Sequence, residues 1–141
     1  MAHGKTANVS TTIDAPVDAV WDALVTPEKV EKYMFGAKVE SDWQEGSPIT
    51  WKGEWKGKKF EDKGTVRRVE PRRLLEYDHY SPLSGPDTPE NHHKVRIELA
   101  ESGESTRVTL SQDNNSSDEA LAESEKNWRT MLDGLKKVAE A

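Results

Sequence analysis

Histidines and aromatic residues are the chemically most versatile side chains of this sequence, and several recur at every second position. Trp51 and Trp55 belong to one such run, and Tyr77 and His79 belong to another. If the run that begins at His93 pairs with the run that ends near His79, the two histidines lie opposite each other on one face of a sheet. A protein zinc site needs at least three side-chain ligands, and no third is evident. We therefore predict two histidines at the rim of the sheet and no metal site.

Motifs of known catalytic sites do not occur. There is no Gly-x-Ser-x-Gly nucleophile turn, no His-Glu-x-x-His zinc motif and no phosphate-binding loop. The chain contains no cysteine, which removes thiol nucleophiles, disulfides and iron–sulfur clusters. Asp62, Glu76, Tyr77 and Asp78 are acids and bases of a kind that almost any domain contains. We assign no catalytic residue and predict no cofactor.

Charge and composition exclude further classes of protein. The 141 residues carry a net charge of −6, which argues against a dedicated nucleic-acid binder. No apolar run approaches the ~20 residues of a membrane span, and the opening residues are small and polar, unlike a signal segment. We predict a cytoplasmic protein with no membrane span. The segment from Lys52 to Arg73 holds nine basic and four acidic residues, and its charges are expected to face solvent.

The spacing of apolar residues along the chain predicts the strands and helices that position these side chains. Alternation over 7–13 predicts a strand, and helical spacing over 17–24 and 27–34 predicts two short helices. From 37 to 113 the period is two, and short turns make the strands antiparallel. A capping box of Ser116 and Glu119 opens a long helix over 118–140.

A sheet of this size implies a cavity. Seven strands at ~4.8 Å spacing are about 30 Å wide, whereas one helix is only ~10–12 Å across. The sheet must therefore curl around the long helix, and the space that remains is either filled by side chains or left as a pocket. The residues expected to line it are Trp51, Trp55, Tyr77, His79, Val95, Trp128, Met131 and Leu132. Tyr33, Met34 and the connection 81–91 are expected at its mouth.

This order of elements resembles the α+β helix-grip fold of the START and polyketide-cyclase superfamily, also called SRPBCC. In that fold a curved seven-stranded antiparallel sheet wraps around a long C-terminal helix, with two short helices after the first strand. The resemblance rests on 15–24 and 26–28, on Asp42-Trp43, Asp62-Lys63-Gly64 and 70–74, and on Trp128, Leu132 and Leu135. These segments are similar to the branch named after the activator of the heat-shock-protein-90 ATPase. We expect a single domain over 1–141.

The resemblance implies three functions. The first is a non-enzymatic module that binds a small hydrophobic molecule such as a lipid, sterol, polyketide or flavonoid-like compound. The second is a co-chaperone-like interaction domain, with weak chaperone contact, because the co-chaperones carry an extra N-terminal domain that is not in this sequence. The third is a cyclase or hydrolase that uses the same cavity. Single-domain relatives are commonly bacterial, so a bacterial source is expected.

Overall fold

The architecture was obtained as a computed structural model. It describes residues 5–34, 36–55, 57–80, 86, 88, 91–115 and 117–140. The side chains of Trp55 and Lys58 and most of the connection 81–91 lie outside the described part of the chain.

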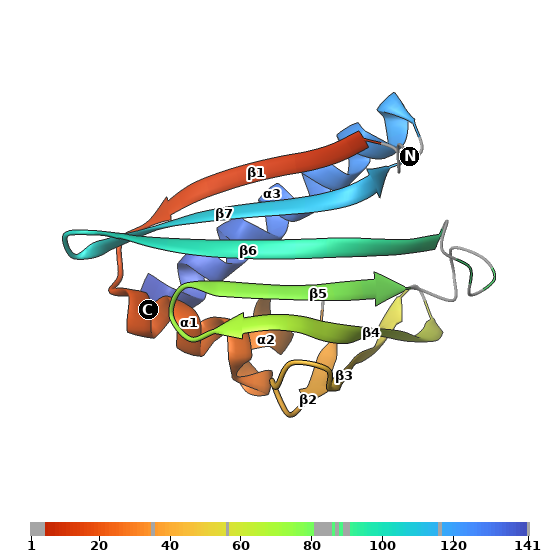
Figure 1. Ribbon diagram of the computed structural model, residues 1–141, viewed down its shortest axis with the longest axis horizontal. Coiled ribbons are helices and arrows are strands. Elements are labelled where there is room, and N and C mark those ends of the chain that lie inside the picture. The colour runs from red at the N-terminus through yellow and green to blue at the C-terminus, as the bar shows by residue number, and fades with distance from the viewer. Residues whose placement is uncertain are drawn as a thin grey trace.

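Seven antiparallel strands form one sheet in the order β1-β7-β6-β5-β4-β3-β2 (Figure 1). Their bounds are β1 Lys5–Ile13, β2 Lys38–Ser41, β3 Pro48–Trp55, β4 Lys58–Glu70, β5 Leu74–Tyr80, β6 His92–Ser102 and β7 Ser105–Asn115. Strands β2 to β7 follow one another as a meander, whereas β1 joins the sheet beside the last strand. A register shift between Val66 and Arg68 marks an irregularity in β4.

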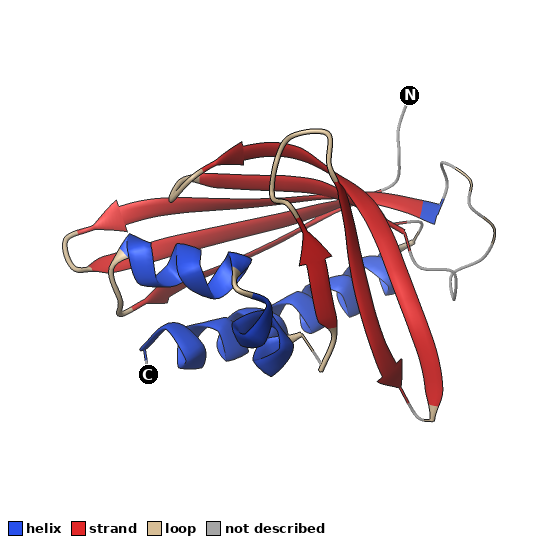
Figure 2. Ribbon diagram, turned by 90° about the horizontal axis from the view of Figure 1, so that it is seen from below, coloured by secondary structure: helices blue, strands red, loops and turns tan. Residues whose placement is uncertain are grey.

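Three helices lie on one side of this sheet, which curves around them (Figure 2). They are α1 Val17–Val25, α2 Pro27–Tyr33 and α3 Asp118–Glu140. Thr26 is the N-cap of α2, and Pro27 is its first residue. Because α3 begins at Asp118, the residue that caps it is Ser117. The Ser117 hydroxyl accepts a hydrogen bond from the N–H of Ala120 at 3.1 Å. The predicted helix-grip fold is confirmed.

The long helix α3 runs along the edge strand β1. Its side chains bond backbone groups of that strand and of the residue that follows it. Glu140 accepts the N–H of Asp14 at 2.8 Å, and Lys136 donates to the carbonyl of Thr12 at 3.2 Å. Unpaired backbone groups at a sheet edge invite pairing with other chains, so these contacts cover one of the two edges.

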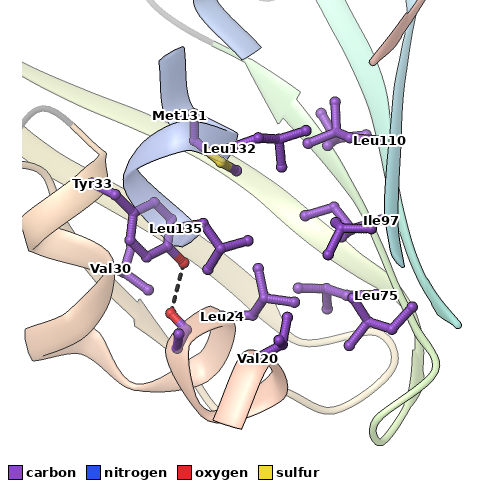
Figure 3. Close-up of a cluster of buried hydrophobic side chains, with 14 of the residues drawn as sticks. Val20, Leu24, Val30, Tyr33, Leu75, Ile97, Leu110, Met131, Leu132 and Leu135 are labelled. Carbon is purple, nitrogen blue, oxygen red and sulfur yellow. Dashed lines mark hydrogen bonds between the residues drawn. The ribbon is translucent and has the colours of Figure 1, made fainter. Parts of the chain in front are cut away.

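The core lies between the concave face of the sheet and the helices (Figure 3). From α3 it takes Met131, Leu132 and Leu135, all buried. Leu121 and Trp128, on the same apolar face of α3, are only half-buried. None of the described helices is both long and apolar enough to cross a membrane, and the cytoplasmic location stays a prediction.

Candidate functional site

Between the concave face of the sheet and the helices, the described residues enclose a small cavity and a larger groove of different character. The first is an apolar cavity of about 20 Å³ under α1 and α2. A space of that size holds roughly one water molecule. Its lining residues are Leu24, Val30, Tyr33, Met34, Val39, Trp43, Ile49, Trp51, Leu75, Tyr77, Ile97 and Met131. Side chains therefore fill almost all of the space between α2 and the sheet.

Two buried tyrosines lie beside this cavity. The Tyr33 hydroxyl donates a hydrogen bond to the carbonyl of Ala23 at 2.7 Å, as Figure 3 shows. The rings of Tyr77 and Trp51 are 5.1 Å apart. Burial raises the pKa of Tyr33 and of Tyr77 above the usual value, since the phenolate would lose its hydration.

The second hollow is a larger groove of about 350 Å³ between α3 and the sheet. Met34, Trp128 and Met131 form its apolar part. The other lining residues are polar, namely Asp62, His79, His93, Gln112, Ser124 and Asn127. The groove thus combines an apolar wall with several polar side chains, and such groups fix the orientation of a ligand in small-molecule sites.

Strand alternation explains how polar residues reach this groove. Asp62 has the same parity as buried Val66 in β4, and Gln112 continues the inward row of Val108 and Leu110 in β7. His79 and His93 are direct register partners on β5 and β6, as predicted. Each of four adjacent strands, β4 to β7, thus contributes one polar side chain to the groove.

Asp62 and His79 form a hydrogen-bonded pair at the groove. Asp62 Oδ2 lies 2.8 Å from His79 Nε2. The two side chains are 16% and 29% exposed, so the imidazole is accessible from the groove while the carboxylate is mostly covered. Asp62 Oδ1 is buried and has no hydrogen-bond partner among the described residues. Trp51 contacts His79 edge to face, with ring centres 5.0 Å apart.

The other polar side chains of the groove are held by hydrogen bonds of their own. His93 Nδ1 lies 3.0 Å from the carbonyl oxygen of Asp113. The Trp128 indole N–H donates to Gln112 Oε1 at 2.6 Å, which ties α3 to β7. The Ser124 hydroxyl donates to Asn115 Oδ1 at 2.6 Å.

The structure divides the residues that the sequence placed in one cavity. Trp51, Tyr77 and Tyr33 line the small cavity, whereas His79 and Trp128 line the groove. Met34 and Met131 line both hollows.

Three other residues that were predicted to line the cavity are not found in the lining of either hollow. Val95 and Leu132 are buried in the core and line neither hollow. The Trp55 side chain lies outside the described residues.

Several lining residues were not in the predicted set. The hollows are also lined by Asp62, Gln112, Ser124, Asn127 and Trp43, for which the sequence pattern predicted no lining role. A signal for two of them was present, because Asp62 and Gln112 are polar residues at inward-facing strand positions. Within the described part of the chain, no three His, Asp or Glu side chains come close enough together to hold a metal ion.

Comparison with known proteins places the chain among relatives of this architecture. The family model described as "Activator of Hsp90 ATPase homolog 1-like protein" (AHSA1) matches residues 14–140. A protein from Cytophaga hutchinsonii with a known solution structure is 52% identical, with 97% of this chain and 94% of that chain covered and a TM-score of 0.85.

Two further solved structures are more distant. CalU16 from Micromonospora echinospora is 25% identical, covering 95% of this chain and 75% of that one, with a TM-score of 0.73. The Aha1 dimer from Colwellia psychrerythraea is 20% identical, with 96% of each chain covered and a TM-score of 0.74, which shows a shared fold. A search of the curated proteins found no match. The family model spans nearly the whole chain and the helix-grip architecture agrees with it, so the chain belongs to the AHSA1 family of the SRPBCC superfamily.

Proposed function

We propose that this protein is a non-enzymatic binding module for a small, partly apolar molecule, held in the groove between α3 and the sheet. The observation that carries the proposal is the composition of the groove wall. Trp128, Met131 and Met34 offer apolar surface, and inward-facing polar groups stand beside them. A surface of this kind buries a ligand and also fixes its orientation.

The size of the groove narrows the ligand class. Small-molecule sites usually measure roughly 300–1,000 Å³, and this groove of about 350 Å³ lies at the lower end. A molecule of one or two rings fits such a volume better than a sterol or a two-chain lipid. The first hollow, of about 20 Å³, is too small for any of these.

An unsatisfied buried acceptor also supports ligand binding. Asp62 Oδ1 has no partner among the described residues, although buried polar atoms in native proteins are nearly always hydrogen-bonded. A bound molecule, or a water carried with it, supplies the missing donor.

The test begins with native mass spectrometry of the freshly purified protein, which reports any co-purified ligand. One- and two-ring aromatics, flavonoids, sterols and lipids are then screened by calorimetry and thermal melting. We expect small aromatics to raise the melting temperature by mass action.

Two tryptophan variants locate the binding site. Trp128→Ala should weaken ligand binding about tenfold or more, because the indole forms part of the groove wall. Trp21→Ala is the matched control, since Trp21 is half-buried on α1 and does not line the groove. The proposal fails if no compound binds, or if both variants bind like the wild type.

Chaperone contact is the second candidate function, and membership of the AHSA1 family favours it. Saturable binding to a purified heat-shock-protein-90 homologue, with stimulation of its ATPase, would support this function. Binding of a small molecule, with no stimulation of the chaperone ATPase, favours the first candidate function, the binding module.

A further inference from the structure

We infer that the groove selects a neutral ligand that carries a hydroxyl donor on an apolar ring, and that His79 Nδ1 accepts the hydrogen bond from this hydroxyl. This inference rests on the proposed function and names the chemistry of its ligand. It follows from two observations. The first is which ring nitrogen of each groove histidine is hydrogen-bonded within the protein, and the second is the charge of the residues around the groove.

The bond to Asp62 sets the tautomer of His79. A carboxylate is an acceptor only, so the short contact between Asp62 Oδ2 and His79 Nε2 requires the proton on Nε2. In the neutral imidazole the other nitrogen, Nδ1, then carries a lone pair and accepts hydrogen bonds. Among the described residues, Nδ1 has no donor of its own.

His93 is held in the opposite tautomer by a different acceptor. The Asp113 carbonyl oxygen, 3.0 Å from His93 Nδ1, also only accepts, so Nδ1 carries the proton. The lone pair of neutral His93 is therefore on Nε2. Because His79 and His93 are register partners on adjacent antiparallel strands, their Cβ atoms are about 5 Å apart, and the groove holds two imidazole acceptors side by side.

The charges of the groove disfavour anionic ligands. Asp62 contributes a carboxylate, and none of the described lining residues is a lysine or an arginine. A carboxylate or phosphate ligand would meet lone pairs and a negative charge in a partly desolvated site. A neutral hydroxyl supplies one hydrogen-bond donor, which His79 Nδ1 accepts.

The apolar surroundings favour a flat ring as the carrier of the hydroxyl. Trp51 contacts His79 on one side, and Trp128 and Met131 belong to the helix across the groove. Aromatic and thioether side chains pack well against aromatic rings. The combination of acceptors and apolar wall therefore fits a hydroxylated aromatic molecule.

Three matched probes test the inference on the wild-type protein by calorimetry. They are 2-naphthol, 2-methoxynaphthalene, which lacks the donor, and 2-naphthoate, which is an anion. We expect 2-naphthol to bind about tenfold more tightly than either analogue, the effect of one hydrogen bond in a desolvated site. Equal binding of 2-naphthol and 2-methoxynaphthalene overturns the inference but leaves the proposed function standing. If none of the three binds and the wider screen is also negative, both fail.

Variants then assign the acceptor. His79→Phe keeps a ring but removes the nitrogen, so the preference for 2-naphthol over 2-methoxynaphthalene should vanish. His92→Phe is the matched control, because His92 follows the opposite parity on β6 and stacks on Tyr80 at 5.0 Å. A preference that survives in His79→Phe, or that disappears equally in the control, contradicts the assignment.

Asp62 acts here as a positioning residue, and its role has a separate readout. Long-range proton–nitrogen NMR spectra of the wild type should show the Nε2–H tautomer for His79 and the Nδ1–H tautomer for His93. In Asp62→Asn the amide can also donate, so His79 should lose its single tautomer and the preference for 2-naphthol should fall. The reverse tautomers in the wild type overturn the inference without any variant.

Discussion

Two tyrosine hydroxyl groups in the apolar interior link the stability of this protein to alkaline pH. Tyr33 and Tyr77 are 6% and 4% exposed, and burial raises the pKa of both phenols. In the unfolded chain they titrate near the ordinary value of 10.0. Above that pH the unfolded state has released protons that the folded state still holds. The contribution of the two tyrosines is therefore fully present below pH 10 and is lost as the pH rises further.

The free energy of unfolding should fall above about pH 10 by up to ~1.4 kcal/mol per pH unit for each buried tyrosine. Tyr77→Phe should make this fall less steep, because phenylalanine has no proton to release and keeps the packing against Trp51. Urea unfolding between about pH 8 and 12 measures the slope for both proteins. Identical slopes would show that Tyr77 does not contribute to the pH dependence.

At the scale of elements, the contact between α2 and α3 depends on a glycine. A Cβ at Gly134 would lie 2.7 Å from Tyr33 Cβ and 3.4 Å from Tyr33 Cα. Alanine in a helix is normally favoured over glycine by about 1 kcal/mol, but here the methyl group would force the two helices apart. The helix keeps a poor helix former at the point where its neighbour comes closest.

Gly134→Ala should therefore lower the free energy of unfolding by roughly 1–3 kcal/mol, as overpacking does. Chemical denaturation measures the change. Ala122→Gly, at an exposed position of the same helix, reports the propensity effect alone and should cost about 1 kcal/mol. A Gly134→Ala protein more stable than the wild type would show that propensity outweighs the close approach.

At the scale of the whole molecule, α3 has two structural roles. It closes the concave face with Met131, Leu132 and Leu135, and its polar side chains cover the outer edge of β1. With 23 residues it is about 35 Å long and spans the sheet from end to end (Figure 1). That residues 1–141 form a single domain stays a prediction.

A chain that ends at Asn115 should not fold. Removal of the three buried side chains alone costs ~1.5–3 kcal/mol for each, compared with a total stability of ~5–15 kcal/mol for a typical domain. It would also expose the β1 edge to other chains. Circular dichroism and sedimentation should show an aggregated or non-cooperative species. A soluble protein with a cooperative thermal transition would contradict this expectation.

Local periodicity was sufficient to predict the elements, and their order supports the resemblance that implies the helix-grip fold. The alternation at Ile49 and Trp51, and the spacing of Trp128, Leu132 and Leu135, are properties of neighbouring positions along the chain. They specify which face of each strand or helix is apolar, because side-chain direction repeats every two or 3.6 residues. The family resemblance follows from the same segments. The sequence also predicted that His79 lies opposite His93, on the condition that these two consecutive strands pair, and the structure shows this pairing.

The division of the inward side chains into a filled cavity and an open groove depended on the tertiary structure. It is set by the curvature of the sheet and by the path of α3 along β1, and these arise from contacts between residues more than a hundred positions apart. Leu121 and Trp128 show the consequence, because both lie on the apolar face of α3 yet remain half-buried. The Asp62–His79 bond likewise depends on the register of β4 against β5, which shifts between Val66 and Arg68. Periodicity shows which way a side chain points, whereas what it meets there depends on how distant elements pack.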